Sequence, residues 1–147
     1  MKSKAIKILM VFIFLFTISM NAQESIITKE GLPKSAQQFI SANFTTYTID
    51  YVKMDKEILS TDYKVKFTDG AEIEFDSEGI WQEVSGKKEA IPTAFIQKSI
   101  LTYVSEKFPH AHIVKIEKGR FGKQEVKLSN GLELEFNSKG EFKRIDD

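Results

Sequence analysis

Apolar and charged residues alternate in short runs through the middle of the chain, a pattern typical of β-strands with one buried face. Residues 63–67 and 71–75 each place apolar side chains at every second position, with lysines between them in the first run and glutamates in the second. A two-residue turn between the runs would set Phe67 opposite Glu72 on one face of the sheet. A three-residue loop ending at Gly70 instead sets the apolar residues of one run opposite those of the other. The pattern therefore predicts this hairpin, with Gly70 in a left-handed conformation.

The same register predicts which charged residues face each other. It places Lys66 opposite Glu72 and Lys64 opposite Glu74, and such pairs stabilise a sheet by about 0.2–1 kcal/mol each. The same reasoning predicts three further loops of this kind, ending at Gly79, Gly131 and Gly140. We therefore expect short antiparallel hairpins whose second face is charged.

The hairpin pattern occurs twice in the chain. Residues 70–79 recur as residues 131–140, with six of the ten positions identical. The repeat divides the chain into two predicted units, residues 32–86 and residues 91–147. Units of this size bury too little apolar surface to be stable alone, so we expect them to pack together or to pair edge to edge.

Each unit is predicted to begin with a helix. Pro33 suits the first helical position of one helix, and Pro92 opens a longer second helix that ends before Pro109. The predicted apolar faces are Leu32, Ala36, Phe39, Ile40 and Phe44 in the first helix and Phe95, Ile96, Ile100, Tyr103, Val104 and Phe108 in the second. With an earlier strand near residues 51–58 and 113–118, each unit becomes a helix packed on a four-stranded antiparallel meander, an α+β fold.

The amino-terminal residues are typical of a secretory signal peptide. Lys2, Lys4 and Lys7 precede an unbroken apolar run over residues 8–16, and residues 19–23 offer a small-residue cleavage site after Ala22. The alternative is a membrane anchor, but the apolar stretch is too short to cross a bilayer core of about 30 Å. We therefore expect residues 1–22 to be removed, leaving a periplasmic or secreted protein without a stable membrane span.

Composition excludes several functional classes. The 147 residues include 21 basic and 21 acidic side chains and no cysteine. A protein that tracks nucleic-acid phosphates needs a basic excess, so nucleic acid is not an expected partner. Disulfides, thiol catalysis and cysteine-bound metals are ruled out. The chain also lacks the phosphate loop, dinucleotide fingerprint and nucleophile elbow, so we predict no enzymatic activity and no cofactor.

Two histidines are the first candidates for metal binding. His110 and His112 are two residues apart, so in a strand both would face the same way and could offer two nitrogens to zinc or copper. The equivalent positions in the first unit are Thr46 and Thr48, so this pair is not part of the repeat. A solvated loop after the second helix is the favoured interpretation, and no metal site is predicted.

Paired carboxylates are the second candidates. Glu72 with Glu74, and Glu133 with Glu135, could supply an acid and a base or oxygen ligands for calcium. In the predicted register they lie on the solvated face, and in the first unit they face lysines. Catalytic carboxylates need a pocket that shifts their pKa, and the pattern predicts none.

The repeated motif resembles that of a known family. A signal peptide, a helix opening with Leu-Pro or Ile-Pro, and tandem Gly-x-Glu-Ile/Leu-Glu-Phe-Asp/Asn-Ser-x-Gly motifs followed by an aromatic residue are similar to the PepSY-like family of bacterial exported proteins. This family is also described as beta-lactamase-inhibitor-like. The resemblance implies a periplasmic or secreted, non-enzymatic protein that binds or inhibits other proteins.

The absence of enzyme motifs and the resemblance to this family together predict a binding module whose partner is a protein of the cell envelope. The predicted binding residues, on the charged face of the sheet, are Lys64, Lys66, Glu72, Glu74, Lys127, Glu133 and Glu135. The alternative is a periplasmic protein that binds a small ligand or a cation through its acidic strands or through His110 and His112.

Overall fold

The computed structural model describes residues 23–146, which form a nine-stranded antiparallel sheet and two α-helices. The strands are β1 (Gln23–Ile27), β2 (Ile49–Lys56), β3 (Thr61–Phe67), β4 (Glu72–Phe75), β5 (Trp81–Ser85), β6 (Ile113–Lys118), β7 (Gln124–Leu128), β8 (Glu133–Phe136) and β9 (Phe142–Asp146). The helices are α1 (Lys34–Asn43) and α2 (Lys98–Lys107), and two short 3₁₀ turns are η1 (Lys29–Gly31) and η2 (Arg120–Gly122). The predicted signal peptide, residues 1–22, lies outside the described residues.

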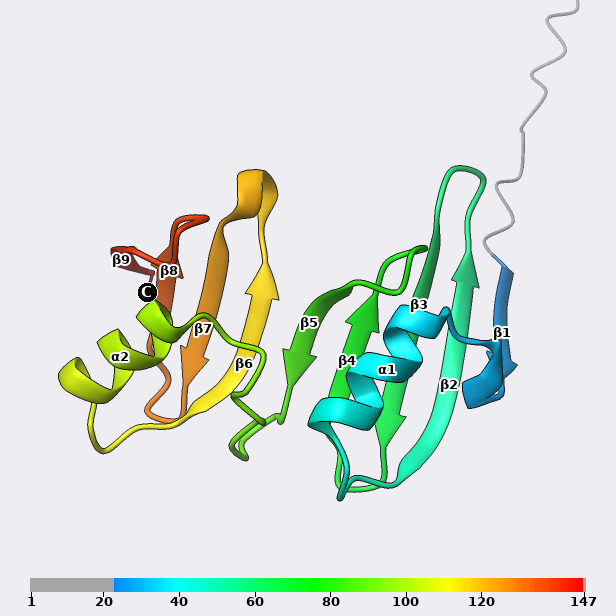
Figure 1. The fold of residues 1–147 in the computed structure, drawn as a ribbon, viewed down its shortest axis with the longest axis horizontal. Helices are drawn as coiled ribbons and strands as arrows, with labels where there is room; N and C mark the ends of the chain where they lie inside the picture. Colours follow the sequence, from blue (N-terminus) through cyan, green and yellow to red (C-terminus); the bar gives the residue numbers. More distant parts are fainter. Residues whose placement is uncertain (1–22, 147) are drawn as a thin grey trace, which may run out of the picture.

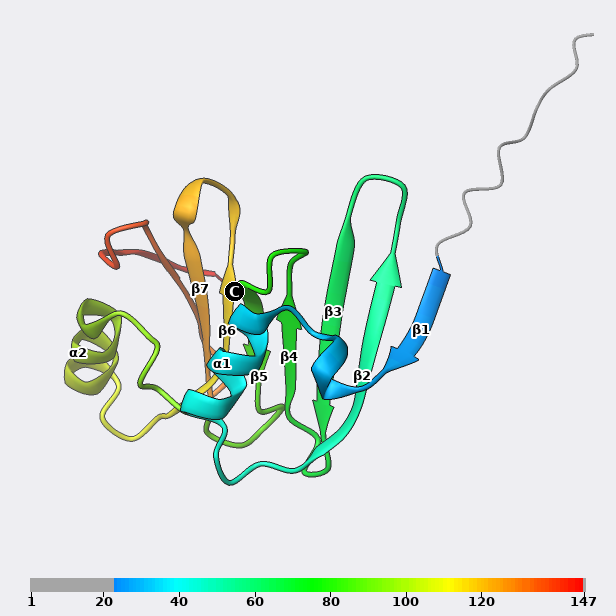
Figure 2. The same ribbon diagram turned by 45° about the vertical axis from the view of Figure 1, so that its right-hand side comes forward.

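The strands lie in the sheet in the same order as in the chain, and both helices cover one face (Figure 1, Figure 2). The mixed fold class and the antiparallel sheet are therefore confirmed. Within residues 23–146, no helix is long and apolar enough to cross a membrane.

A row of aliphatic side chains crosses the sheet beneath the helices. Seven adjacent strands each contribute one residue that is at most 1% exposed: Val52, Val65, Ile73, Val84, Ile116, Val126 and Leu134. Ala36 and Ile40 of α1 and Ile100 of α2 are buried in the same core. This row holds the sheet and both helices around one continuous core.

The predicted hairpin register is confirmed. Val65 pairs with Ile73, and the N–H of Phe67 donates to the carbonyl oxygen of Ala71 at 2.9 Å, which closes the three-residue loop. Gly70 in that loop has a φ of 94°, in the region that favours glycine. The equivalent hairpin of the second repeat is built in the same way, with φ 92° at its glycine.

The first turn of each helix packs against the second hairpin loop of its repeat. The hydroxyl of Ser35 donates to the carbonyl oxygen of the residue before Gly79, and the hydroxyl of Ser99 donates at 3.3 Å to that of the residue before Gly140. Both glycines have positive φ, 79° and 74°. The loop glycines therefore set the loop conformation and leave room for the helices.

Strands β5 and β6 pair directly, so the sheet is continuous. Of the two arrangements expected from the sequence, this is edge-to-edge pairing. Val84 lies opposite Ile116 in this ladder, which we call the seam. Above the seam, the ring of Phe95 lies 4.9 Å from that of Phe39 in α1 and 5.2 Å from that of Trp81, between centroids. This aromatic contact ties α1 to the segment that leads into α2.

The predicted start of the second helix is wrong. α2 begins at Lys98 rather than Pro92, and both helices have ten residues, so the second is not longer. The N–H of Ile91 donates to the carbonyl oxygen of Ile113 at 3.0 Å, which holds this segment against β6. Phe95 is also held in the aromatic contact above the seam. The chain can therefore turn into a helix only after Phe95.

Strand β1 was not predicted. It adds a ninth strand at the edge of the sheet, with Gln23 opposite Lys56 and Ile27 opposite Val52. Its sequence, Gln-Glu-Ser-Ile-Ile, does not alternate, so period-two analysis does not detect it. Backbone pairing with the long strand β2, rather than a pattern in the sequence of β1, holds these residues in an extended conformation.

Candidate functional site

The sheet face turned away from the helices carries mostly charged side chains, and we call it the open face. Successive residues of a strand point to opposite sides, so the neighbours of the aliphatic row project here. The seven predicted binding residues are on this face: Lys64, Lys66, Glu72, Glu74, Lys127, Glu133 and Glu135. Whether they bind a partner remains a prediction.

The predicted ion pairs of the first hairpin are confirmed. The ammonium nitrogen of Lys66 lies 2.5 Å from a carboxylate oxygen of Glu72, and that of Lys64 lies 2.7 Å from Glu74. Lys87 adds a second cation at 2.8 Å from Glu72. Burial raises the pKa of Glu72, but the two lysines outweigh this effect and hold the pKa at about 2.

In the corresponding hairpin of the second repeat, one of the two glutamates is buried. Lys127 lies 2.6 Å from Glu133, and this hydrogen bond lowers the pKa of the Glu133 carboxyl. Glu135 is only 6% exposed, which corrects its predicted place on a solvated face. Lys123 at 2.9 Å and Arg144 at 3.0 Å lie against its two oxygens, and their hydrogen bonds and charges lower its pKa.

Five glutamates form a line across the open face. Each lies directly opposite the next on adjacent strands, and we call them the glutamate row: Glu74, Glu83, Glu117, Glu125 and Glu135. Like charges in this position destabilise a sheet. At the seam, Lys115 compensates part of the repulsion with its ammonium nitrogen 3.1 Å from Glu83 and 2.9 Å from Glu117.

Sequence reasoning missed the central members of this row. Glu83, Glu117 and Glu125 each adjoin a residue of the buried aliphatic row, so their face could have been predicted from the period of two. That they adjoin one another depends on the β5–β6 pairing, which joins segments distant in sequence.

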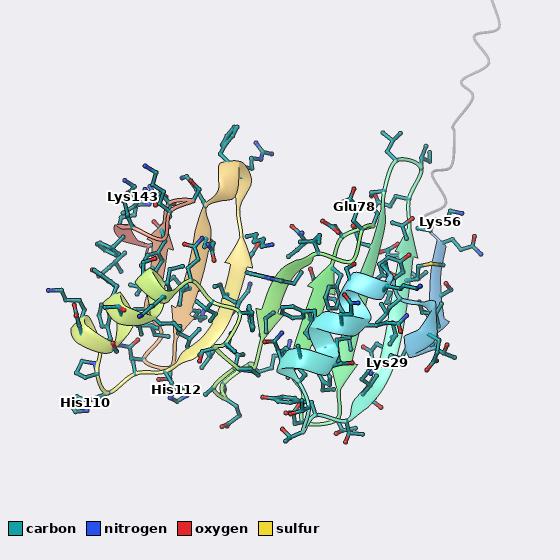
Figure 3. All side chains as sticks on the ribbon, viewed as in Figure 1. Lys29, Lys56, Glu78, His110, His112 and Lys143 are labelled. Atoms are coloured by element: carbon teal, nitrogen blue, oxygen red, sulfur yellow. The ribbon has the colours of Figure 1, made fainter. Side chains whose placement is uncertain are left out.

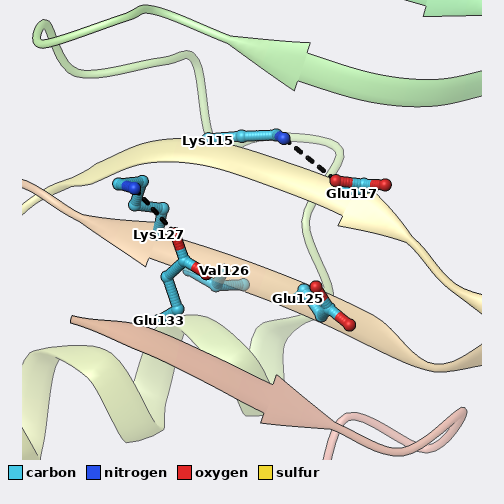
Figure 4. Close-up of a pocket in the computed structure, with 6 residues that line it drawn as sticks. All are labelled: Lys115, Glu117, Glu125, Val126, Lys127 and Glu133. Atoms are coloured by element: carbon cyan, nitrogen blue, oxygen red, sulfur yellow. Dashed lines mark hydrogen bonds and ion pairs between the residues drawn. The ribbon is translucent and has the colours of Figure 1, made fainter. Parts of the chain in front are cut away.

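A small hollow lies on the open face over β6 to β8 (Figure 4). It is lined by Lys115, Glu117, Glu125, Val126, Lys127 and Glu133. Its volume of about 40 Å³ has room for roughly one water molecule. This hollow suits a water or an ion better than an organic ligand, for which pockets of about 300–1,000 Å³ are usual.

Three carboxylates converge next to this hollow. One oxygen from each of Glu125, Glu135 and Asp146 lies within 4.8 Å of the others. Oxygen ligands of this type suit calcium. The site is not purely acidic, because Glu135 is already paired with Lys123 and Arg144.

The two histidines lie elsewhere. His110 and His112 are exposed in the loop after α2, at the end of the sheet away from Lys56 and Glu78 (Figure 3). The N–H of His112 donates to the Ser129 hydroxyl at 3.1 Å, which anchors the loop to the neighbouring hairpin. The structure therefore does not bring them to the acidic strands of the open face.

Comparisons with known proteins agree with the repeat. The model of a family described as beta-lactamase-inhibitor-like and PepSY-like matches the chain over residues 18–67 and again over residues 61–144. No curated protein matches the chain.

Three solved structures of Bacteroides proteins are similar over nearly their whole length. A Bacteroides vulgatus protein described as periplasmic and of the DUF2874 family is 37% identical, with a TM-score of 0.79 over 85% of this chain and 98% of that one. A Bacteroides thetaiotaomicron protein described as a "putative calcium-regulated periplasmic protein" is 38% identical, with a TM-score of 0.80 over 84% and 97%. A second periplasmic protein of unknown function from Bacteroides vulgatus is 34% identical, with a TM-score of 0.78 over 85% and 100%. The chain is accordingly a periplasmic or secreted protein, as its sequence predicts.

Proposed function

This chain belongs to the PepSY-like, beta-lactamase-inhibitor-like family, and on that premise we propose that it is a non-enzymatic binding module of the cell envelope whose open face engages another protein. Its two units are residues 32–86 and 91–147, each a helix on a four-stranded meander. Pairing at the seam turns their two charged faces into one surface.

The glutamate row is the observation that carries this proposal. It runs over five adjacent strands, which at a spacing of about 4.8 Å makes a line of roughly 19 Å. Lysines compensate part of the repulsion at four of these carboxylates, those of Glu74, Glu83, Glu117 and Glu135. Among the described residues, Glu125 is the member of the row without an ion pair. A partner with basic groups would relieve the repulsion, so we infer a polar contact that weakens as salt rises.

The electrostatics of three carboxylates on this face support binding rather than catalysis. A carboxyl group that donates a proton near neutral pH needs a raised pKa. On the open face, the pKa values of Glu72, Glu133 and Glu135 are all lowered by neighbouring cations. These carboxylates remain charged and suit electrostatic recognition.

Charge reversal on the glutamate row tests the proposal. The triple variant Glu74→Lys, Glu117→Lys, Glu125→Lys should retain at least tenfold less of any partner captured from the native envelope at low salt. The matched control reverses three exposed glutamates outside the face, Glu30, Glu89 and Glu106, and so makes the same change in net charge. Melting curves would verify that both variants are folded.

The control should capture the partner as the natural chain does, and capture by the natural chain should fall as salt is raised. Equal capture by the triple variant, with the same salt response, would show that the open face is not the binding surface.

A second candidate function is calcium binding at Glu125, Glu135 and Asp146. Two observations favour it: the three carboxylate oxygens converge within 4.8 Å, and one relative is described as calcium-regulated. Lys123 and Arg144 would have to release Glu135 in part, so we expect weak affinity. Calcium would then change the charge pattern of the open face.

Calcium titration of the thermal midpoint tests this candidate. At ten times the dissociation constant, calcium should raise the midpoint by about 5 °C. Glu125→Gln should abolish the rise. Glu74→Gln, in the same row but outside the trio, should keep it. A midpoint that does not respond to calcium in the natural chain would eliminate the candidate.

A further inference from the structure

Two hairpin tips carry large apolar side chains that project into solvent. Ile58 and Leu59, between β2 and β3, are 67% and 97% exposed, and Phe121, between β6 and β7, is 95% exposed. A single exposed apolar residue is ordinary on a protein surface. These side chains instead occupy the tips of two equivalent hairpins, one in each repeat.

Both hairpins project at the same end of the sheet. The β2–β3 and β6–β7 connections extend beyond the neighbouring loops in both views (Figure 1, Figure 2). Three strand spacings separate β3 from β6, or about 14 Å. Both tips can therefore contact the same external surface, each at its own point.

The second tip holds its aromatic residue at a conformational cost. Phe121 has a φ of 59° and lies between Gly119 and Gly122. A bulky residue in the left-handed region is strained, and a glycine there would avoid the strain. The exposed ring packs on nothing that would repay this cost within the described residues, which points to a contact outside the chain.

The charges differ between the two tips. Residues 118–123 include Lys118, Arg120 and Lys123 and no acidic residue, and Arg120 is exposed beside Phe121. In the first tip Lys56 adjoins Glu57, and Asp55 and Asp62 flank residues 56–61. The second tip therefore matches an anionic lipid surface, where the aromatic ring enters the interface and the cations meet headgroups, and the first tip adds apolar side chains to the contact.

The first described residue lies at this end of the sheet. Gln23, which follows the predicted cleavage site, pairs with Lys56 at the base of the first tip. A signal sequence held in the bilayer would thus join the sheet at the end that carries both tips.

We propose that the tips at residues 56–61 and 118–123 anchor the protein reversibly to an anionic bilayer surface by inserting Leu59 and Phe121 into the lipid interface. This function is separate from the open face, which stays free for a protein. It requires no membrane-spanning segment, because the contact is peripheral.

Vesicle sedimentation with residues 23–147, which contain every described element, tests the proposal. The chain should bind phosphatidylglycerol vesicles with an apparent lipid dissociation constant on the order of a millimolar, and phosphatidylcholine vesicles at least several-fold more weakly. Leu59→Ser with Phe121→Ser should weaken binding to phosphatidylglycerol at least tenfold. Ile26→Ser with Ile145→Ser, exposed residues of the two edge strands, is the matched control and should bind as the natural chain does.

A tryptophan reporter gives a readout that does not depend on sedimentation. The fluorescence of Phe121→Trp, measured against the natural chain with its own Trp81, should shift to shorter wavelength on phosphatidylglycerol vesicles. No binding by the natural chain, or equal binding by the Leu59/Phe121 double variant, would overturn the proposal. Loss of a captured envelope protein in that variant, with vesicle binding unchanged, would instead assign the tips to a protein.

The open-face triple variant should bind vesicles at least as strongly as the natural chain, because it keeps Leu59 and Phe121 and adds positive charge next to the second tip. Failure of the open-face proposal and failure of this one are therefore distinguishable.

Discussion

Replacing Gly79 with valine should lower the free energy of unfolding by about 3 kcal/mol or more, because two costs add. Gly79 has a φ of 79°, which strains any residue with a Cβ atom. A Cβ at this position would also lie 2.7 Å from the Cβ of Pro33 and 2.9 Å from the backbone nitrogen of Ala36. Because these atoms belong to the start of α1, the helix would have to move off the hairpin.

The matched control is Gly70→Val. Gly70 has a similar φ of 94°, but no atom lies within 4 Å of the Cβ it would gain, so strain is the only cost. We expect a loss of about 1–2 kcal/mol there. Urea unfolding curves of the two variants give the comparison directly. Equal losses would mean that α1 does not press on the loop, and no loss at Gly70 would contradict the turn assignment.

Acid should remove a contribution to stability that depends on Glu72. Its pKa is about 2 in the folded protein, against 4.5 in a free side chain. A lowered folded-state pKa stabilises the protein above the unfolded value, so this contribution is complete above about pH 5 and is lost as the pH falls toward 2. The shift converts to at most about 3 kcal/mol, and partial exposure of Lys66 and Lys87 reduces this to about 1–2 kcal/mol.

Urea midpoints measured from pH 7 to pH 2 for the natural chain and Glu72→Gln give the test. The variant should be less stable at pH 7, and its stability should fall less between pH 5 and pH 2. Glu89→Gln, an exposed residue off the sheet, serves as the control and should follow the natural curve. Parallel curves for Glu72→Gln and the natural chain would show that the contacts with Lys66 and Lys87 contribute little.

The local part of the fold follows from the sequence because its causes are local. Pairing Phe67 with a charged residue would have put a carboxylate into the core, and this alone selects the three-residue loop ending at Gly70. The ion pairs of Lys64 and Lys66 then follow from the register. Four loop glycines with positive φ confirm the same reasoning.

The remaining features depend on contacts between distant segments. Ile91 hydrogen-bonds to Ile113, and Phe95 packs on Phe39 and Trp81, so the second helix starts later than its proline predicts. Strand β1 forms because the longer strand β2 offers hydrogen-bonding partners along its edge.

The candidate site shows the same division. Period-two alternation predicts the face on which a glutamate lies, but only the seam determines that Glu83 and Glu117 are neighbours. The burial of Glu135 likewise depends on Arg144 from the last strand. Local patterns therefore identify the open face, and long-range pairing arranges its charges.

The order of the strands has a consequence for folding. Each strand pairs only with the strands that precede and follow it in the chain, and most of these partners are joined by short loops. Such a topology keeps the loop-closure cost low and favours rapid folding. An exported chain emerges from its channel one end first, so each hairpin can form while later residues are still in transit. The exceptions are the β1–β2 and β5–β6 pairs, whose strands are separated by α1 and α2. These two ladders are expected to close after the hairpins.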